Sequence, residues 1–322
     1  MSSKKNKIMS MSEAISQFVH DGDHITLGGF VTNRKPYAAV HEIIRQGIKD
    51  LYITSGAGGG DIDLLIGCGS VKVLSTSYIA NSGFTQVSRQ MKKSIKEGKI
   101  LFDDYSLDGH SLQFHAAALG VPYLPIKFML GSDIADQWGI PLEFWQNDSK
   151  LPNAKHIIAE DPFNPGDKVL LLPAAKIDVA IIHVQQAAPD GTARLMGPSF
   201  YDEDMAMGAT HCIITCEEIV HPDELRYEPW RNQFPNVVVE AVVEAPYGAH
   251  PSQCAGYYDY DGVALNEYDK LSGDDELFKQ YVDEYIRGTK DHSEYLDKIS
   301  TSHLQTLKIK SGWSFVPGLK RK

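Results

Sequence analysis

The 322-residue sequence has few cysteines, no long apolar run and no surplus of positive charge. Its four cysteines are too few and too scattered for a disulfide framework, which favours a reducing, cytoplasmic location. Residues 1–7 are polar and no apolar signal segment follows them, and no stretch comes near the roughly 18 apolar residues of a membrane helix. With 31 Lys and Arg against 42 Asp and Glu, the net charge of −11 argues against nucleic-acid binding.

Several motifs of catalysis and cofactor binding are also missing. The sequence has no Gly-x-Ser-x-Gly elbow, no phosphate-binding loop ending in Gly-Lys-Ser/Thr and no Gly-x-Gly-x-x-Gly that opens a helix. The twelve histidines lack thiols or carboxylates at zinc-site spacing, and Cys212 and Cys216 fall on one face of a predicted strand. We therefore predict no metal site and no permanently bound cofactor.

One pattern occurs three times in the N-terminal third: a short apolar strand, a loop of glycine, serine or asparagine, and a helix. The predicted strands are 24–27, 51–54 and 71–75, and the loops after them are 28–34, 55–60 and 81–83. The helix before the first strand is expected to begin at a Ser10 capping box, and the helices after the three strands near Pro36, at an Asp61 cap and near Thr85. This pattern is typical of a parallel sheet, whose ligands bind beyond the carboxyl ends of the strands. The three loops at that edge are therefore the candidate site.

The second half continues the same architecture after an interruption. Residues 147–168 are rich in Asn, Asp, Pro and Lys, which predicts a surface excursion. Further elements are predicted as strands 168–172, 179–185, 211–217 and 237–243, a helix at 204–209, helical segments over 274–307 and a frayed tail at 318–322. We expect a single α/β domain, residues 1–322, with a mostly parallel open sheet and helices on both faces. Its sub-regions are 9–146 and 169–307, followed by the C-terminal stretch 308–322.

Two local features have both a binding and a structural interpretation. In Gly28-Gly29-Phe30, the missing side chains let backbone N–H groups approach an oxyanion, but a glycine pair also makes a simple tight turn. His250 lies before a proline in a loop that follows a predicted strand. It could contact a carboxylate or cofactor, or it could hold the turn by a hydrogen bond.

A set of short motifs resembles a known family over about residues 9 to 307. These are 22–25 (Gly-Asp-His-Ile), 28–30 (Gly-Gly-Phe), 34–40 (Arg-Lys-Pro-Tyr-Ala-Ala-Val), 80–83 (Ala-Asn-Ser-Gly), 115–120 (His-Ala-Ala-Ala-Leu-Gly), 180–183 (Ala-Ile-Ile-His), 189–192 (Pro-Asp-Gly-Thr) and 245–254 (Ala-Pro-Tyr-Gly-Ala-His-Pro-Ser-Gln-Cys). Together they resemble the α subunits of family I coenzyme A transferases, and most closely the glutaconate branch. Many other branches carry an oxyanion-binding asparagine in the second loop. This sequence has Ser-Gly-Ala-Gly at 55–58 there, which favours backbone donors.

The resemblance implies a function that needs a second chain. In this family the nucleophile is a glutamate on the β subunit, which attacks the acyl thioester to give an anhydride and then a glutamyl-CoA thioester. The chain is therefore expected to carry no catalytic nucleophile and to be inactive alone. With its β subunit, in an assembly of more than one αβ pair, it would move coenzyme A from acetyl-CoA to a small dicarboxylic acid such as (E)-glutaconate. The coenzyme A thioester is a substrate, not a permanent cofactor.

The resemblance also assigns roles to residues of the candidate site. The hydroxyl of Ser82 is expected to bind the substrate carboxylate, and the guanidinium of Arg34 is expected to bind the distal carboxylate of a dicarboxylic acid. The full predicted substrate-binding set is Asn81, Ser82, Gly28, Gly29, Phe30, Arg34 and His250. Because the chain is acidic and coenzyme A is a polyanion, the phosphates should be held by the β subunit or by a local basic patch.

Two other functions remain open. Relatives of the same fold are coenzyme A thioester hydrolases or decarboxylases, and in a hydrolase the acting carboxylate would be near Asp104 or Asp108. The third possibility is a non-catalytic subunit that stabilises another enzyme. The convergence of three glycine or serine loops argues against that role, because such loops have no common packing requirement.

Overall fold

The computed structural model of the chain describes residues 6–85 and 88–319, and its larger sheet has eight strands. The strand order is β11-β10-β8-β1-β2-β3-β4, with the short β9 paired to β8. Every pairing is parallel except that of β8 with β9, so the predicted mostly parallel α/β sheet is confirmed. The strands are β1 (His24–Leu27), β2 (Leu51–Gly58), β3 (Val71–Ile79), β4 (Leu101–Asp104), β8 (Ile177–Ala187), β9 (Ala193–Arg194), β10 (Ala209–Ile219) and β11 (Ala241–Glu244).

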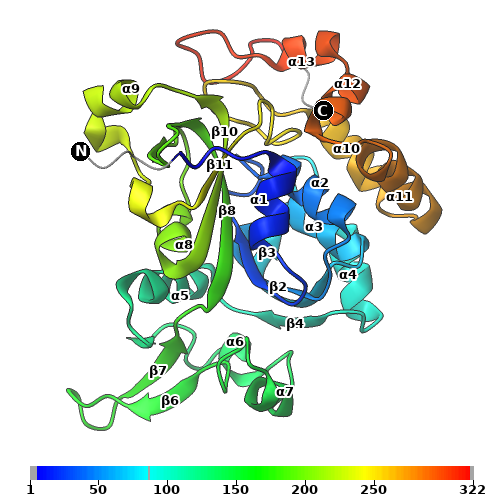
Figure 1. The fold of residues 1–322 in the computed structure, drawn as a ribbon. Helices are drawn as coiled ribbons and strands as arrows, with labels where there is room; N and C mark the ends of the chain where they lie inside the picture. The colour runs from blue at the N-terminus through cyan, green and yellow to red at the C-terminus, as the bar shows by residue number, and fades with distance from the viewer. Residues whose placement is uncertain (1–5, 86–87, 320–322) are drawn as a thin grey trace.

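Helices cover both faces of this sheet (Figure 1). One layer consists of α1 (Met11–Phe18), α2 (Tyr37–Gln46), α3 (Gly60–Gly67) and α4 (Arg89–Lys96), and the other of α5 (Leu107–Leu119) and α8 (Asp202–Gly208). Successive residues of β8 alternate between the two cores: Val179 and Ile181 pack with the first layer, and Ala180 and Ile182 with the second. Because both faces are buried, these strands have the continuous apolar sequences that were predicted.

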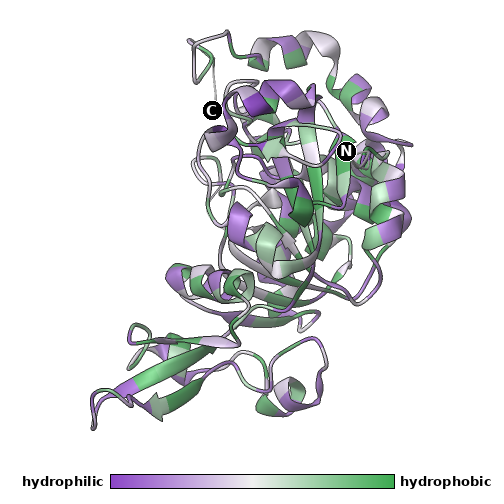
Figure 2. Ribbon diagram, turned by 60° about the vertical axis from the view of Figure 1, so that its left-hand side comes forward, coloured by the Kyte–Doolittle hydropathy of each residue, from purple (hydrophilic) through white to green (hydrophobic). Residues whose placement is uncertain are grey.

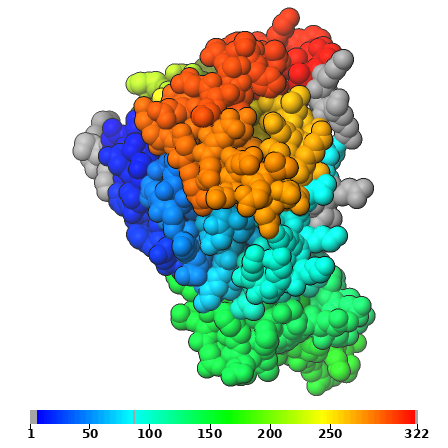
Figure 3. All heavy atoms as spheres, turned by 90° about the vertical axis from the view of Figure 1, so that its right-hand side faces the viewer, coloured from blue at the N-terminus to red at the C-terminus, as the bar shows by residue number. Residues whose placement is uncertain are grey.

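A smaller sheet projects from the main body (Figures 1 and 3). It is antiparallel, in the order β5-β7-β6, with strands β5 (Tyr123–Ile126), β6 (Ile157–Glu160) and β7 (Lys168–Pro173). The short helices α6 (Asp133–Asp136) and α7 (Leu142–Asn147) precede β6. The prediction that strand 168–172 belongs to the main sheet is wrong. That strand is apolar because its residues Leu170 and Leu172 pack in a separate small core, and its two edges pair with β5 and β6.

The C-terminal segment lies over the first helical layer (Figure 3). It consists of α10 (Gly262–Leu271), α11 (Asp275–Val282), a π-helical turn (Asp283–Arg287), α12 (His292–Ile299) and α13 (Thr301–Leu307). Three short helical elements lie between β10 and the start of β11: α9 (Pro222–Tyr227) and the 3₁₀ turns Pro229–Arg231 and Asn236–Val238. Over the described ranges, no helix combines the length and the apolar character needed to span a bilayer.

Several element boundaries differ from the predictions. Residues 55–58, predicted as loop, continue β2, and β3 also extends to Ile79. Helix α4 begins at Arg89 instead of Thr85, with residues 86–87 outside the described part, and the C-terminal residues 320–322 of the predicted tail also lie outside it. Strand β11 begins only at Ala241, because the preceding residues form a 3₁₀ turn. The capping box at Ser10 is confirmed. Gly47, in the left-handed conformation, ends α2.

Candidate functional site

The loops after β1, β2 and β3 meet at the carboxyl edge of the sheet, as predicted. The Val31 N–H in the first loop donates to the Ala57 carbonyl at 3.4 Å. The Gly60 N–H in the second donates to Asn81 Oδ1 in the third at 2.8 Å. A Cβ on Gly59 would lie 2.8 Å from the carbonyl oxygen of Val31, so glycine permits this close approach. The three loops therefore form one connected surface.

The turn Gly28-Gly29-Phe30 has all three of its amides bonded inside the chain. The Gly28 N–H donates to the Ile181 carbonyl at 2.9 Å, and the Phe30 N–H donates to the Asn33 carbonyl at 3.0 Å. The Gly29 N–H donates to Asp202 Oδ1 at 2.6 Å. Gly28 and Gly29 are buried and Phe30 is half-buried, so the turn presents the Phe30 ring while its N–H groups hold its own shape.

Position 29 accepts only glycine. Its φ is +80°, and a Cβ there would stand 2.3 Å from the Asn33 carbonyl oxygen. This region of φ is unfavourable for residues with a Cβ, and the distance is far below van der Waals contact. The glycine pair is thus required by the geometry of the turn.

Arg34 lies inside the chain, behind this turn. Its guanidinium donates to Asp202 Oδ2 at 2.8 Å, to the Pro198 carbonyl at 2.6 Å and to the His183 carbonyl at 3.1 Å. Burial alone would raise the pKa of Asp202, but the Arg34 charge and the hydrogen bonds to the carboxylate hold it below the usual value. A substrate carboxylate bound by Arg34, as predicted from the sequence, would have to displace these partners.

A second buried cation holds the turn from the opposite side. Lys35 Nζ lies 3.3 Å from the Gly28 carbonyl oxygen, 3.2 Å from that of Gly29 and 3.8 Å from Asp61 Oδ2. The pKa of Lys35 is lowered, chiefly because burial disfavours its charge. Asp61 Oδ1 in turn accepts the Gly59 N–H at 2.9 Å, which connects the turn to the second loop.

The third loop offers an accessible hydroxyl. Ser82 is half-buried, and its Oγ lies 2.8 Å from the hydroxyl of the exposed Tyr78. Asn81 is buried and acts within the chain: besides accepting from Gly60, its carbonyl oxygen accepts the N–H groups of Phe84 and Thr85. Ser82 can therefore donate to a ligand carboxylate, while Asn81 shapes the loop.

Aromatic side chains border the turn. The ring centroids of Phe30 and Phe200 are 5.0 Å apart, and those of Phe200 and Tyr201 are 3.7 Å apart. A Cβ on Gly56 would lie 2.5 Å from the Phe200 ring, so the glycine that suggested a loop instead makes room for this ring against β2. These rings give the site an apolar wall.

His250 is buried, and both its ring nitrogens have partners within the chain. Nδ1 lies 2.7 Å from the Tyr295 hydroxyl, and Nε2 lies 2.9 Å from Asp261 Oδ2. Asp261 also lies 2.6 Å from His303 Nε2 and caps α10. In this arrangement His250 connects its loop to α10 and α12, which corresponds to the structural interpretation of the sequence motif.

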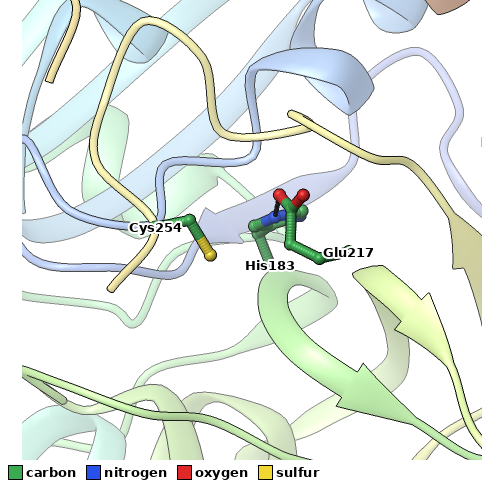
Figure 4. A group of neighbouring side chains, drawn as sticks. All are labelled: His183, Glu217 and Cys254. Carbon is green, nitrogen blue, oxygen red and sulfur yellow. Dashed lines mark hydrogen bonds and ion pairs between the residues drawn. The ribbon is translucent and has the colours of Figure 1, made fainter. Parts of the chain in front are cut away.

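One group of side chains could supply metal ligands. His183, Glu217 and Cys254 are buried, and their candidate ligand atoms lie within 4.8 Å of one another (Figure 4). His183 Nε2 lies 2.7 Å from Glu217 Oε1, which also accepts the Tyr258 hydroxyl at 2.6 Å, and His183 Nδ1 lies 2.8 Å from Thr215 Oγ1. Burial raises the pKa of the Cys254 thiol, which opposes the thiolate that binds metals. The group is therefore a satisfied hydrogen-bond network behind the Gly28 turn.

Sequence reasoning missed the residues that hold the site from behind. Asp202 contacts Gly29 across 173 positions of sequence, and no local pattern marks a contact so distant. Phe200 was missed for the same reason, although Gly56 in an otherwise apolar strand was a usable signal of a close ring. Lys35 lies within the motif at 34–40, but no function was predicted for it.

Comparison with known proteins gives consistent similarities. The model of the coenzyme A transferase family matches residues 8–245. The chain is 50% identical to a glutaconate CoA-transferase subunit from Acidaminococcus fermentans over 314 residues, which is 98% of this chain and 96% of that protein. The crystal structure of that enzyme superposes with a TM-score of 0.94 over 96% of this chain and 98% of the other.

Two further relatives are less similar. The chain is 34% identical to a 3-oxoadipate CoA-transferase subunit from Pseudomonas knackmussii, over 91% of this chain and 98% of that one. It is 26% identical to a chain in a crystal structure of the decarboxylase AibA/AibB, with a TM-score of 0.73, over 87% of this chain and all of the other.

Proposed function

The chain belongs to the coenzyme A transferase family, and on that premise we propose that it is the α subunit of a heteromeric enzyme that transfers coenzyme A from acetyl-CoA to a small dicarboxylic acid such as (E)-glutaconate. Coenzyme A thioesters are the substrates of this family. Two relatives support a dicarboxylic acceptor, since one is named for glutaconate and the other for 3-oxoadipate.

The observation that supports a two-chain enzyme is the state of the carboxylates behind the site. Asp202 is bonded to Gly29 and Arg34, Asp61 to Gly59, and Glu217 to His183 and Tyr258. A buried carboxylate that is bonded to groups of its own chain, or that faces a cation of that chain as Asp61 faces Lys35 at 3.8 Å, is a poor nucleophile for an external thioester. We therefore place the nucleophilic glutamate on a partner β subunit.

In this proposal the reaction proceeds through covalent intermediates on the partner's glutamate. The partner's glutamate attacks the acetyl carbonyl, releasing the coenzyme A thiolate and leaving a mixed anhydride. The thiolate then attacks the glutamyl carbonyl, which gives a glutamyl-CoA thioester and acetate. The acceptor carboxylate attacks this thioester, and the released thiolate takes the acyl group from the second anhydride, restoring the glutamate. The covalent route thus divides one difficult exchange between two acids into a series of simpler displacements.

The α subunit supplies the surface against which the acid is oriented. In this proposal the Ser82 hydroxyl donates to the acid carboxylate, and Asn81 fixes the loop that carries it. Gly28, Gly29 and Phe30 line the reaction space together with Phe200. Arg34 and His250 act from behind the loops, because their polar contacts lie within the chain.

The experiment is co-expression of this chain with its β subunit, followed by an assay of coenzyme A exchange between acetyl-CoA and glutaconate. The complex should transfer coenzyme A, each chain alone should not, and borohydride should trap a thioester on the β subunit during turnover. 3-Oxoadipate and a monocarboxylic acid serve as comparison acceptors. Full activity of the isolated α chain would contradict the proposal.

Decarboxylation of a coenzyme A thioester is the second candidate, because the fold also matches a decarboxylase with a TM-score of 0.73. The same complex separates the two functions. Carbon dioxide release without a trapped thioester would support decarboxylation, and free coenzyme A without acid exchange would support a hydrolase. A non-catalytic role is indicated if replacing Ser82 or Gly29 leaves the assembled activity unchanged.

The small sheet suggests where further chains make contact. Ile157, Ile158 and Phe163 are 60%, 46% and 89% exposed, and the strands of this projection are strongly hydrophobic (Figure 2). Ile157 and Ile158 are consecutive residues of β6 and lie on opposite faces of the small sheet, so both faces of the projection expose apolar side chains, as is typical of regions that another chain contacts. We propose that the complex contains more than one αβ pair, which its mass in solution by light scattering will test.

A further inference from the structure

The backbone of the Gly28 turn is held on two sides by buried charges. On one side, the Asp202 carboxylate accepts the Gly29 N–H at 2.6 Å and pairs with Arg34 at 2.8 Å. On the other, the Lys35 ammonium faces both glycine carbonyls and lies 3.8 Å from Asp61. All four charged side chains are at most 1% exposed. Two cations and two anions thus enclose a single turn.

Stability alone is a weak reason for such an arrangement. Charges are costly to remove from water, and a buried ion pair is often replaceable by apolar residues without loss of stability. The Arg34–Asp202 pair also restricts which residue can occupy position 28, because a Cβ on Gly28 would stand 2.5 Å from Asp202 Oδ1. The carboxylate therefore packs directly against the glycine pair.

The backbone around the turn is also strained. Gly29, Val31 and Arg34 have φ values of +80°, +55° and +53°, and two of these residues carry a Cβ. Non-glycine residues persist in this region only where the surroundings enforce it, and such positions cluster at functional sites. The charge pairs provide that enforcement.

Asp202 connects the turn to the aromatic wall. It is the first residue of α8, two positions after Phe200, whose ring lies 5.0 Å from that of Phe30. One carboxylate thus fixes the backbone before Phe30 and the segment that carries Phe200. Both rings lie beside the surface on which the acid is proposed to bind.

We infer that Asp202 is a positioning residue for coenzyme A transfer, which acts through the Gly29 amide to hold Phe30 and Phe200 in place. This inference rests on the proposed function. The two rings exclude water and fix the distance between acid carboxylate and thioester. Loss of the contact should lower kcat and let water intercept the thioester, while the Ser82 contact that binds the acid is retained.

The test uses Asp202→Asn in the assembled αβ complex, with Asp103→Asn as the matched control. Asp103 also pairs with a fully buried cation, Lys155, at 2.7 Å, but it lies at the end of β4, three strands from β1. We expect Asp202→Asn to lower kcat by about 10- to 100-fold with the KM for the acid within about 2-fold. The ratio of thioester hydrolysis to transfer should rise. Asp103→Asn should keep the wild-type kcat, KM for the acid and ratio of hydrolysis to transfer.

Amide hydrogen exchange gives a readout that does not depend on activity. Peptides covering residues 24–36 should lose protection in Asp202→Asn and keep it in Asp103→Asn. If Asp202→Asn does not assemble, Arg34→Lys replaces it, since lysine can retain the charge pair but not the full fork of contacts to His183 and Pro198. That variant should show the same changes to a smaller degree.

The outcomes separate the inferred role from the proposed function. If the wild-type complex transfers no coenzyme A, the proposed function fails and with it the inferred role. If the wild type is active and Asp202→Asn matches the control in kcat and in the hydrolysis ratio, only the inference is overturned. Unchanged exchange protection at residues 24–36 would overturn it as well.

Discussion

One buried cation–carboxylate pair lies within the main body, and a second joins the edge strand β4 of the main sheet to the small projecting region. Arg34 and Asp202 are 2.8 Å apart behind the first loop of the main sheet, and Lys155 and Asp103 are 2.7 Å apart where β4 meets the projection. The first pair contacts a turn with positive φ. Lys155 instead lies 5.2 Å from the Tyr105 ring and 3.4 Å from the Gln137 carbonyl oxygen.

The contrast shows that burial and pairing alone do not indicate a functional role. Asp103 accepts the amides of Asp104 and Gly139, and it connects β4 to the segment before α7. Gly139 also has no room for a side chain, since a Cβ there would stand 2.1 Å from the Phe102 carbonyl oxygen. Of the two carboxylates, Asp202 is the one that accepts an amide at a residue with positive φ, in the turn that carries Phe30. The distinguishing feature is therefore what the carboxylate holds, and variants of the two regions can test this difference.

The largest effect is expected from Gly29→Ala. The added Cβ would lie 2.3 Å from the Asn33 carbonyl oxygen, so the loop has to move. Together with the unfavourable φ, this should lower the unfolding free energy by about 2–5 kcal/mol. Turnover of the complex should fall at least about 100-fold. Denaturant unfolding measures the loss of stability, and the assay of coenzyme A exchange measures the loss of turnover.

The control for this variant is Gly47→Ala. Gly47 has a similar φ of +71° but no atom within 4 Å of its added Cβ. It should lose only the roughly 1–2 kcal/mol of left-handed strain and keep full turnover in the complex. Equal loss of activity in the two variants would show that the turn after β1 has no special role.

The second prediction replaces both partners of a pair. Asp103→Asn alone should lower the unfolding free energy, but by less than the roughly 3–5 kcal/mol of a fully broken buried pair, because Lys155 keeps the more distant and half-exposed Asp104 carboxylate at 3.6 Å. The double variant Asp103→Leu with Lys155→Met should recover most of that stability, since apolar residues of similar volume replace buried pairs well. Activity should remain normal throughout.

The corresponding double substitution at the Gly28 turn should behave differently. Asp202→Leu with Arg34→Met removes both charges, so stability should partly return, but the Gly29 amide has no acceptor and turnover should stay low. Recovery of turnover in this double variant would show that the Arg34–Asp202 pair, like the Lys155–Asp103 pair, has only a structural role.

The architecture of the main sheet could be predicted because its signals are local. Apolar runs, glycine stops and caps lie within a few residues of the elements they define, as Ser10 and Gly47 show. The meeting of three loops at one edge followed from the parallel order alone. The place of Ser82 in the third loop followed in the same way, but its role in binding the acid was implied by the resemblance to the family and stays a prediction.

The roles of charged residues could not be predicted, because they depend on distant partners. Arg34 has the chemistry of a carboxylate-binding group, but its carboxylate is Asp202, which lies 168 positions away. The same limit applies to the strand at 168–172, whose apolar sequence suits either sheet. Only the pairing of β7 with β5 and β6 assigns it to the projection.

A smaller effect is expected from Ser82→Ala. The loss of one hydrogen bond to a charged carboxylate should raise the KM for the acid by about 10- to 100-fold, with a smaller change in kcat. Ser16, an exposed serine of α1, provides the matched control, and Ser16→Ala should change neither constant. An unchanged KM in Ser82→Ala would move acid binding away from the third loop, although the turn after β1 could still shape the site.

The smallest effect concerns acid stability and two buried histidines, one in the main sheet and one on α5 facing the small core. Burial lowers the pKa of His24 on β1 to about 4 and that of His110 on α5, whose ring lies 5.0 Å from that of Tyr105 in the small core, to about 3. Because the folded pKa is below the ordinary 6.5, each contribution is complete above pH 6.5 and is lost as the pH falls toward the folded value. At pH 5.5 the loss is about 1 kcal/mol per group. His24→Gln and His110→Gln should each flatten the fall in unfolding free energy between pH 7 and 5. If α5 and the small core open separately from the main sheet, His110→Gln should change exchange protection in residues 107–173 alone, whereas equal changes throughout would show that the two regions unfold together.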